Sequence, residues 1–296
     1  MRIFVNRNFL IIINPAAGKA TFKAKYDRIV SHFSQLGFSY ETFYTTLADD
    51  PSRLQDKIKL NTYDDVIVLG GDGTLNYVVN GMVESNIPIS VISNGTGNDA
   101  LRSIHHQFDL EKQIDIATNG EPKILDLGKC NTRYFLNGVG LGFDGAVVDT
   151  MIRRGKRYAG HWAYMSTVLE LLFKYKSVHF KADIDNILLD RKLFSMTIGN
   201  GTTFGGGFQT NPRAKMDDGL LDLMMIHPAN MIQRPLFMLI VMMAQHGNFG
   251  FTTMQKAKEI KIEKTPGLKA HIDGELLPDG AYQIKIVPGA ISFRMP

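Results

Sequence analysis

The sequence predicts two domains, an N-terminal α/β domain followed by a mainly antiparallel β domain. The chain has 296 residues, which is enough for one large domain or two of ordinary size. Strand and helix patterns alternate up to about residue 125, and the rest of the chain forms short, glycine-bearing strand patterns. We therefore expect domains of residues 1–125 and 126–289, and the last residues, about 290–296, could return to the first domain.

Apolar strands alternate with amphipathic helices in the first domain. The first predicted helix ends at Gly37, the second has Pro51 in its first turn, and the third carries Leu75, Val78 and Val79 on one face. This alternation is typical of a parallel sheet with helices on both faces. The predicted strands are 9–13, 39–45, 64–70 and 87–93, and the predicted helices are 21–37, 50–60 and 75–84.

Short strand patterns dominate the second domain, and many of them contain glycine. They predict an antiparallel sheet or a β-sandwich, interrupted by a helix at 162–175 and a second at 233–245. A cleft between the two domains is expected to follow. The predicted strands are 134–145, 179–189, 193–201, 220–227, 258–264, 268–277, 282–289 and 290–295.

Three glycine-bearing loops follow strands of the first domain. They read NPAAG from Asn14, GGDGT from Gly70 and NGTGND from Asn94. In a parallel sheet, ligands bind where strands end and helices begin, because helix N-terminal amides are unpaired and carry partial positive charge. Glycine also lets the backbone approach a phosphate closely. The three loops therefore predict a phosphate-binding crevice.

Asp72 lies inside the second of these loops, and a carboxylate would repel phosphate. We expect it to attract Mg²⁺ or to orient a hydroxyl group, although it could equally cap the following helix. Neither the dinucleotide motif G-x-G-x-x-G after a strand nor a complete P-loop is present, since Ser or Thr is missing after Gly18-Lys19.

Two acidic turns of the second domain also stand out. The DGE sequence from Asp273 to Glu275 offers a carboxylate as a general base, and DDGLLD from Asp217 to Asp222 offers oxygen ligands to a hard cation. Each has a plainer interpretation. Asp-Gly is a strong hairpin-turn pair, and an acidic run often forms a solvated turn.

These motifs together resemble the diacylglycerol kinase catalytic family, which includes bacterial soluble lipid kinases and the sphingosine kinases. NPAAG, GGDGT, GTGND, DDGLLD and DGE occur in the family's order from Asn14 to Glu275 and so cover nearly the whole chain. The resemblance implies a phosphofructokinase-like α/β domain that binds ATP, a β-sandwich that brings the lipid, and transfer of the γ-phosphate to a primary hydroxyl of a lipid such as diacylglycerol.

The resemblance also implies roles for individual residues. Glu275 would accept the proton, with Asp273 as the other candidate base, and Asp72 and Asp273 would help to hold Mg²⁺ or the hydroxyl. A structural Mg²⁺ would be bound by the Asp218 carboxylate and by the carbonyls of Lys215 and Leu220. The residues expected to contact ATP are Asn14, Pro15, Ala16, Ala17, Gly18, Thr45, Gly70, Gly71, Asp72, Gly73, Thr74, Leu75, Asn76 and Thr96.

Composition limits the partners of the protein. The formal net charge is +4, no run of five lysines and arginines predicts nucleic-acid binding, and the single cysteine, Cys130, fits a reducing cytosol. The most apolar segment, 235–244, is too short to span a bilayer. We therefore expect a cytoplasmic protein that visits the membrane surface, where its basic cluster docks on anionic lipid; an exposed edge strand in the second domain would permit a homodimer. The cluster comprises Arg153, Arg154, Lys156 and Arg157.

Other functions remain open from the sequence. An NAD kinase or a phosphofructokinase also carries GGDGT, and a sphingoid base could replace diacylglycerol as the acceptor. A nucleotide-binding regulator without turnover is the alternative of another class, but it would be expected to have lost a carboxylate, and Asp72, Asp99, Asp273 and Glu275 are all present.

Overall fold

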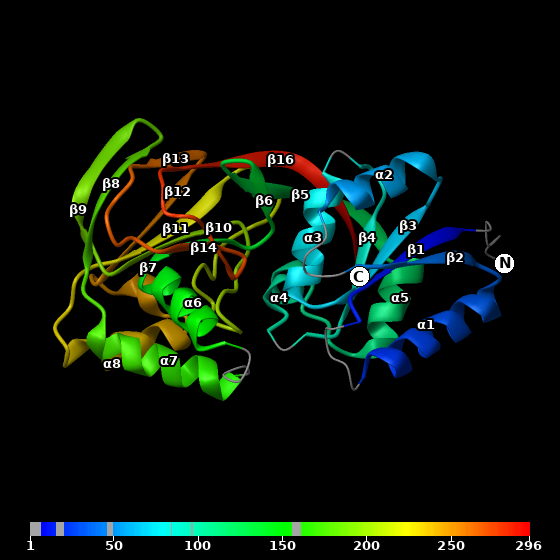
Figure 1. Cartoon of the computed structure of the whole chain (residues 1–296), viewed down its shortest axis with the longest axis horizontal. Coiled ribbons are helices and arrows are strands. Elements are labelled where there is room, and N and C mark those ends of the chain that lie inside the picture. Colours follow the sequence, from blue (N-terminus) through cyan, green and yellow to red (C-terminus); the bar gives the residue numbers. More distant parts are fainter. Residues whose placement is uncertain (1–6, 16–20, 46–49, 84, 96, 156–160) are drawn as a thin grey trace. The chain divides into compact units, whose positions relative to one another are not determined.

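A computed structural model describes residues 7–15, 21–45, 50–83, 85–95, 97–155 and 161–296, without the side chain of residue 161. The chain divides into two compact units (Figure 1). Unit 1 comprises Met1–Leu125 and Gly289–Pro296, and unit 2 comprises Asp126–Pro288. The predicted fold class is confirmed, with a parallel α/β unit and a sandwich-like antiparallel unit.

The centre of unit 1 is a parallel sheet in the order β2-β1-β3-β4. Its strands are β1 (Asn8–Ile13), β2 (Ser39–Tyr44), β3 (Asp65–Gly70) and β4 (Ile89–Ser93), and the end of the last strand of the chain joins β4 in parallel at Phe293. All residues of β3 and β4 are buried, which is expected for strands that helices cover on both faces.

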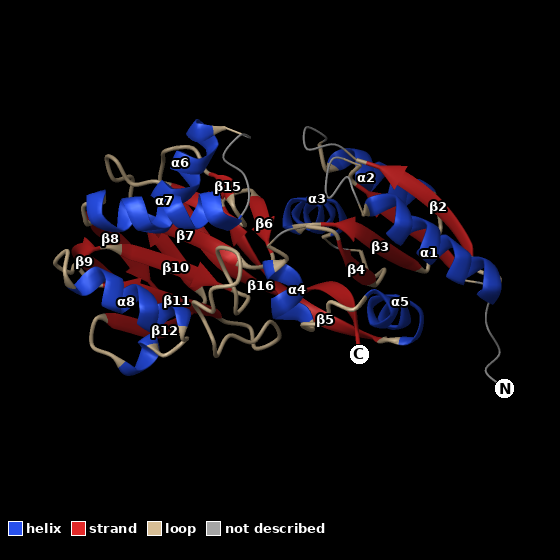
Figure 2. Ribbon diagram, turned by 90° about the horizontal axis from the view of Figure 1, so that it is seen from below, coloured by secondary structure: helices blue, strands red, loops and turns tan. Residues whose placement is uncertain are grey.

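Helices pack on both faces of this sheet (Figure 2). Ile29 and Phe33 of α1 join Ile114 of α5 against alternate residues of β1 and β3. On the other face, α3 packs against β3 and α2 packs against α3. The helices are α1 (Phe22–Leu36), α2 (Ser52–Leu60), α3 (Asp72–Met82), α4 (Asp99–Ile104) and α5 (Leu110–Asn119).

A buried carboxylate connects distant parts of unit 1. Asp65, at the start of β3, is fully buried and accepts hydrogen bonds from the guanidinium groups of Arg7 and Arg294. Arg7 also donates to the carbonyl of Thr118 at 2.6 Å, and Arg294 donates to the carbonyl of Gly120 at 2.5 Å. These bonds join the chain ends to β3 and to the end of α5.

Two antiparallel sheets enclose the core of unit 2. One has the order β12-β11-β10-β7-β14-β15, and the other contains β16, β13, β8 and β9, with β5 and β6 beside β16. Met196 and Ile198 of β10 face the core between the sheets, together with Leu221 and Leu223 of β11. Their neighbours Ser195 and Thr197 face the opposite side, where helices cover the sheet.

The strands of unit 2 are mostly short, and two of them, β5 and β16, extend into unit 1. Strands β5 to β10 are Glu121–Cys130, Arg133–Phe135, Gly138–Gly142, Val178–Ile184, Ile187–Leu193 and Ser195–Gly199. Strands β11 to β16 are Leu221–Ile226, Thr252–Ala257, Glu259–Ile262, Ala270–Ile272, Glu275–Leu276 and Tyr282–Met295. The helices are α6 (Phe143–Arg154), α7 (His161–Lys174), α8 (Gln233–Met242) and a 3₁₀ turn at His246–Asn248.

The structure corrects several predicted elements. The third helix begins at Asp72 rather than at residue 75, so Asp72 belongs to its first turn. Residues 134–145 are not one strand, because α6 starts at Phe143, and the two last predicted strands form the single strand β16. The helices α4 and α5 were not predicted, and neither was strand β12. Among the described residues, no helix is long and apolar enough to cross a membrane.

Candidate functional site

The turn between β3 and α3 presents a helix N-terminus at the carboxyl end of the sheet. Gly71 caps α3 in an extended conformation, and the first hydrogen bond of the helix runs from the Leu75 amide to the Gly71 carbonyl at 3.0 Å. The amides of the preceding first turn have no acceptor within the helix, which makes the turn suitable for an anion. Asp72 and Gly73 are half-buried at this end.

The glycine loop that follows β4, at Asn94 and Gly95, lies directly against the loop between β3 and α3. A Cβ atom built on Gly95 would lie 2.7 Å from the Cα atom of Gly71, so the two backbones touch where neither residue has a side chain. The Asn94 amide donates to the Gly70 carbonyl at 2.8 Å, and the Ala100 amide donates to Oδ1 of Asp72 at 3.0 Å. Asp72 therefore joins the start of α3 to the start of α4.

Thr74, Leu75 and Asn76 of α3, which are also expected to contact ATP, are buried. Thr74 fills the space beside Gly70, where an added Cβ would lie 2.6 Å from the Thr74 side chain. Leu75 lies in the core, and Asn76 accepts a hydrogen bond from Asn80 at 2.9 Å through its carbonyl. These three residues are thus buried beneath the loop, and the glycine backbone and Asp72 form its outer part.

The ends of β1 and β2 reach the same edge of the sheet. Asn14 follows β1 and is buried, and Pro15 after it is exposed. Thr45 follows β2 and is also buried, and its amide donates to the Ile13 carbonyl at 2.9 Å. Of the other residues expected to contact ATP, Ala16, Ala17, Gly18 and Thr96 lie outside the described residues.

A lysine that the sequence analysis did not single out also reaches these loops. Lys25 of α1 donates to the Ser93 carbonyl at the end of β4, and burial lowers the pKa of its ammonium group. Nearby, the Thr21 hydroxyl donates to the Asn94 side chain at 2.8 Å. A cation at this edge would favour an anionic ligand. A single lysine on an amphipathic helix gives no signal of this in the sequence.

The DGE turn lies between β14 and β15 in unit 2. It is a hairpin turn, as the Asp-Gly pair also allowed, and Asp273 and Gly274 both have positive φ. The Asp273 carboxylate accepts three backbone hydrogen bonds, from Leu136 at 2.9 Å, Asn137 at 3.1 Å and Gly138 at 2.8 Å. This carboxylate therefore fixes the turn on the strand beside it.

Glu275 differs from Asp273 in its surroundings. Its side chain is half exposed, and Oε2 accepts a hydrogen bond from the Arg133 guanidinium at 2.6 Å. An exposed carboxylate on a turn can approach a substrate, which a carboxylate that binds three backbone amides cannot do without breaking the turn. Of the two candidate bases, Glu275 is therefore better placed for proton transfer.

The acidic turn at 217–222 is neutralised by a lysine. Lys256 of β12 lies 2.5 Å from Oδ2 of Asp218 and 3.5 Å from Asp222, and the Leu220 amide donates to Oδ1 of Asp218 at 3.1 Å. Burial raises the pKa of Asp222, and the neighbouring lysine opposes that change. The Gly219 amide donates to Asp126 at 2.8 Å, which fixes the turn on β5.

One carboxylate and two carbonyls at this turn would suit a hard cation such as Mg²⁺. In this structure both oxygens of Asp218 have partners, the Leu220 amide and the Lys256 ammonium, so an ion bound by Asp218 would have to displace Lys256. The described residues also contain no group of three or more His, Cys, Asp or Glu side chains arranged to hold a metal. A site of one carboxylate and two backbone carbonyls is not a group of that kind, so the structural Mg²⁺ that the resemblance implies for Lys215, Asp218 and Leu220 stays a prediction.

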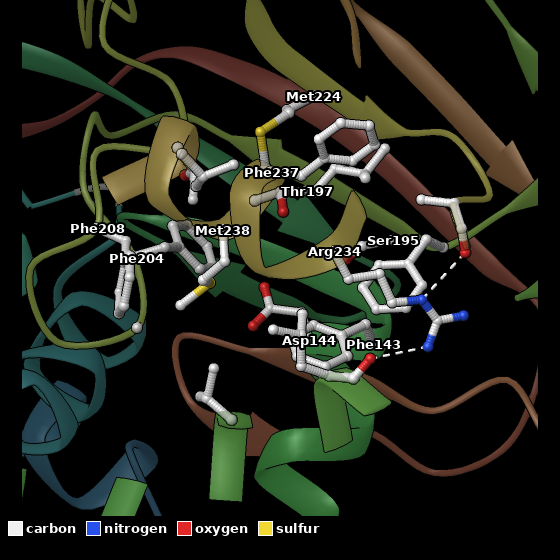
Figure 3. Close-up of a pocket in the computed structure, with 18 of the residues that line it drawn as sticks. Phe143, Asp144, Ser195, Thr197, Phe204, Phe208, Met224, Arg234, Phe237 and Met238 are labelled. Atoms are coloured by element: carbon white, nitrogen blue, oxygen red, sulfur yellow. Dashed lines mark hydrogen bonds between the residues drawn. The ribbon is translucent and has the colours of Figure 1, made fainter. Parts of the chain in front are cut away.

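An apolar pocket lies in unit 2 between the helices and the six-stranded sheet. Its mouth is open to solvent, and the empty space in and in front of it amounts to about 750 Å³. Figure 3 shows Phe143, Phe204, Phe237 and Met238 around it and the Asp144 carboxylate pointing into it. Arg234 also lines the pocket, but its guanidinium donates to the carbonyls of Ala229, Leu172 and Tyr175. The lining suits a hydrocarbon chain.

The two units together define a class of protein. Its members have an α/β unit with glycine-bearing loops at the carboxyl end of a parallel sheet, followed by a sandwich-like unit with an apolar pocket. A crystal structure of a diacylglycerol kinase from Bacillus anthracis str. Sterne has this fold. It matches with a TM-score of 0.73 and 22% sequence identity, over 99% of this chain and 98% of that one. At this identity the likeness supports the fold alone.

Sequence comparisons give the family. Residues 8–130 match the diacylglycerol kinase catalytic domain, and residues 137–294 match the YegS C-terminal NAD kinase beta sandwich-like domain. A diacylglycerol kinase of Staphylococcus haemolyticus (strain JCSC1435) is 30% identical over 90% of this chain and 81% of its own length; one of Staphylococcus carnosus (strain TM300) is 29% identical over 90% and 87%. The chain belongs to the diacylglycerol kinase catalytic family and is an enzyme of the lipid kinase class, which confirms the resemblance inferred from the motifs.

Proposed function

We propose that the protein is an ATP-dependent kinase that transfers the γ-phosphate to a primary hydroxyl of a lipid such as diacylglycerol. The contact between Gly71 and Gly95 carries this proposal, because it places two helix N-termini and their glycine amides at one edge of the sheet in unit 1. The apolar pocket of unit 2 supplies the second requirement, which is a place for an acyl chain.

Unit 1 would bind the phosphates through the backbone. The amides of the first turn of α3 and the Gly95 amide would bind the phosphates, with Lys25 and the ends of β1 and β2 nearby. Phosphoryl transfer depends mainly on such positioning and charge neutralisation. Mg²⁺ would neutralise phosphate charge, and Asp72 fits it, because Oδ2 of this carboxylate has no hydrogen-bond partner in the described part of the chain.

Unit 2 would supply the base. Glu275 would accept the proton of the attacking hydroxyl, and Asp273 would hold the turn that positions it. Arg133, which donates to Glu275, keeps the carboxylate oriented when no lipid is bound. In this assignment, Glu275 of the DGE turn is the general base and Asp273 is the positioning residue.

We also propose that α7 and α8 bind to the cytoplasmic surface of the membrane. Each helix is apolar on two sides. Tyr164, Val168 and Leu172 of α7 line the pocket, whereas Trp162, Leu169 and Phe173 are exposed. On and beside α8, Phe237, Met238 and Val241 line the pocket, and the exposed side chains are Ile232, Leu236, Leu239, Met242 and Met243. The exposed side chains of both helices form what we call the outer apolar face.

The charges around the outer apolar face favour an anionic bilayer over a protein partner. Residues 223–258 contain no aspartate or glutamate, and Lys176 is exposed just after α7. Lys174 is also exposed but pairs with Glu170 at 2.9 Å. The basic cluster predicted from the sequence is likewise partly neutralised, because Arg153 pairs with Asp149 and Arg154 pairs with Glu170. Lys156 and Arg157 lie outside the described residues. Membrane binding would thus rest on apolar side chains with cations beside them.

The test of the proposed reaction is ATP consumption with a total lipid extract, followed by mass spectrometry of the labelled product. The wild-type protein, Glu275→Gln and the surface control Glu263→Gln are compared. We expect turnover in the wild type and the control and a loss of about 10²-fold or more in Glu275→Gln. Full activity of Glu275→Gln would refute the assignment of the base.

Substrate competition separates the alternatives that the sequence left open. NAD, a sphingoid base and diacylglycerol are each offered with ATP. Phosphorylation of NAD alone would identify an NAD kinase-like enzyme, and a preference for the sphingoid base would identify a sphingoid-base kinase. Nucleotide binding without turnover of any acceptor would identify a regulator. We expect phosphorylation of a neutral lipid hydroxyl.

A further inference from the structure

A buried histidine is bonded to the turn that carries Glu275. His271 is the middle residue of β14, its side chain is 4% exposed, and its Nδ1 atom accepts a hydrogen bond from the Gly274 amide at 3.2 Å. The turn needs such support, because Asp273 and Gly274 both have positive φ and a non-glycine residue seldom adopts this conformation. The Asp273 carboxylate holds the first of these two residues, and the His271 ring holds the second.

The bond to Gly274 determines where the ring carries its proton. An amide N–H donates only to a ring nitrogen without a proton, so a neutral His271 is protonated on Nε2. Nε2 lies 3.4 Å from Oδ2 of Asp144, in the first turn of α6, and has no hydrogen-bond partner among the described residues. A carboxylate beside Nε2 favours a proton on that nitrogen. Asp144 therefore stabilises the tautomer in which Nδ1 can accept the bond from Gly274.

Close backbone contacts keep the two side chains together. A Cβ built on Gly145 would lie 2.1 Å from the Lys269 carbonyl oxygen, so the start of α6 is packed tightly against the residue before β14. Gly140 of β7 is opposite His271 in the sheet, and a Cβ there would lie 2.3 Å from Oδ2 of Asp144 and 2.4 Å from Nε2 of His271. The backbone of β7 thus leaves a space for the pair, and a side chain in that space would displace both polar groups.

We propose that His271 and Asp144 are positioning residues for the reaction, and that the bond to Gly274 holds the turn in the conformation from which Glu275 reaches the acceptor hydroxyl. The inference rests on the proposed function for the role of Glu275 as the base. In this role Asp144 acts on the ring of His271, and the ring acts on the turn. A displacement of about 1 Å in a reacting group can cost on the order of 10²-fold in rate, so one bond in this turn can control catalysis.

Two substitutions of His271 separate the bond to Gly274 from packing. The side-chain oxygen of asparagine can replace Nδ1 as the acceptor, whereas the side-chain amide of glutamine reaches the place of Nε2 and leaves that of Nδ1 without an acceptor. Asparagine is the smaller residue, so a loss of packing alone would make His271→Asn the more harmful variant. We expect the reverse order for kcat with diacylglycerol, a loss of about tenfold or more in His271→Gln and of less than about threefold in His271→Asn. The control is His179→Gln, which removes an exposed histidine of β8 and should keep the wild-type kcat.

The tautomer of His271 tests the role of Asp144. In protein labelled with ¹⁵N-histidine, the chemical shifts of the ring nitrogens give the position of the proton, and the spectrum of His271→Asn assigns the signals. We expect the proton on Nε2 in the wild type and a shift of the population toward Nδ1 in Asp144→Asn, because the asparagine amide can donate to Nε2. The kcat of Asp144→Asn should also fall, and adding His271→Gln should cause little further loss, since both substitutions remove the same bond.

The outcomes distinguish this inference from the kinase proposal. A proton on Nδ1 in the wild type, or a full kcat in His271→Gln, would overturn the positioning role even where Glu275→Gln is inactive and the proposed function stands. Inactive Glu275→Gln and His271→Gln with an active His271→Asn would support both. A wild type without turnover of any lipid would overturn both. If His271→Gln does not fold, the tautomer in the wild type and the kcat of Asp144→Asn still decide.

Discussion

Gly71 and Gly95 touch through their backbones, and the contact leaves no space for a side chain on either residue. A Cβ on Gly71 would lie 3.0 Å from the Cα of Gly95, and a Cβ on Gly95 would lie 2.7 Å from the Cα of Gly71. Both loops follow strands that are neighbours in the parallel sheet, and the Asn94–Gly70 hydrogen bond continues the pairing of β3 with β4. The spacing of the two proposed phosphate-binding turns is therefore set by this contact.

Replacing Gly95 with alanine should separate the two loops. The new methyl group would meet backbone, which cannot rotate away as a side chain can, and overpacking of this kind costs about 1–3 kcal/mol. We expect Gly95→Ala to lower the free energy of unfolding by this amount and to weaken ATP binding roughly tenfold. Urea unfolding and calorimetric titration with ATP measure the two effects.

Gly280→Ala is the matched control for this substitution. The nearest heavy atom to a Cβ on Gly280 is the Pro278 carbonyl oxygen at 3.9 Å, which is an ordinary contact. This variant should keep both stability and ATP affinity. Wild-type ATP affinity in Gly95→Ala, as in the control, would show that the two loops do not bind one nucleotide together.

The two acids of the DGE turn should respond differently to neutralisation. Asp273→Asn should lose stability by about 2–4 kcal/mol. The amide oxygen can still accept the two bonds that Oδ1 accepts, although they become weaker, whereas the bond from Leu136 to Oδ2 is lost, and one hydrogen bond to a charged acceptor contributes about 1.5–3 kcal/mol. Asparagine tolerates the positive φ of this position, so backbone strain does not add to the loss. Urea unfolding measures the change.

Glu275→Gln should instead change stability by less than about 1 kcal/mol, since its pair with Arg133 is exposed. Its effect should be on the rate of lipid phosphorylation. A destabilised Glu275→Gln together with an unaffected Asp273→Asn would reverse the roles assigned to the two acids.

Much of unit 1 could be predicted from the sequence because its signals are local. An apolar run such as 9–13 has no alternation and must be buried on both faces, and glycine loops after such runs mark the ligand edge of a parallel sheet. The start of α3 was missed because Asp72, Gly73 and Thr74 are poor helix formers. Their helical state depends on tertiary contacts, including the bond from Ala100 to Asp72.

The pair of Asp144 and His271 could not be predicted. The two residues are far apart in the sequence, and they meet because β7 and β14 are paired and α6 packs on both strands. The neutralisation of Asp218 by Lys256 is hidden for the same reason, since it depends on the pairing of β11 with β12. Composition alone shows only that such groups exist.

Stability should fall when the solution is acidified from pH 6.5 to pH 4, and His105 should contribute. Burial lowers the pKa of His105 from 6.5 to about 4. In this range the unfolded chain binds a proton at His105 that the folded protein does not, so acid favours unfolding, by up to about 3 kcal/mol for this group. Above pH 6.5 neither state is protonated and the contribution is complete.

His105→Asn should flatten this dependence. Asparagine does not titrate, and its side-chain oxygen can accept the hydrogen bond that the Gln107 amide now donates to Nδ1 of His105 at 3.2 Å. Urea unfolding at pH 7.0, 5.5 and 4.5 gives the slope, and His106→Asn is the control because His106 is exposed. Burial also lowers the pKa of His227 and His246, so part of the slope should remain. Identical slopes for His105→Asn and the wild type would exclude this contribution.

A charge placed on the outer apolar face should abolish binding to membranes without unfolding the protein. Ile232 is 90% exposed and Leu236 is 57% exposed, so glutamate at both positions remains in water in the free protein. On a bilayer the same carboxylates would be drawn into the headgroup region and would repel anionic lipid, which costs about 1 kcal/mol or more for each charge. Co-sedimentation with vesicles of phosphatidylglycerol and phosphatidylcholine measures the loss, which we expect to be tenfold or more for the double variant.

The control is a second double variant, Ile187→Glu with Leu188→Glu, which adds the same two charges outside this face. Ile187 is 73% exposed and Leu188 is 83% exposed on β9, so this variant should bind vesicles like the wild type. Equal losses in the two variants would show that the effect is one of net charge, and unchanged binding of the variant at Ile232 and Leu236 would remove α7 and α8 from the membrane contact.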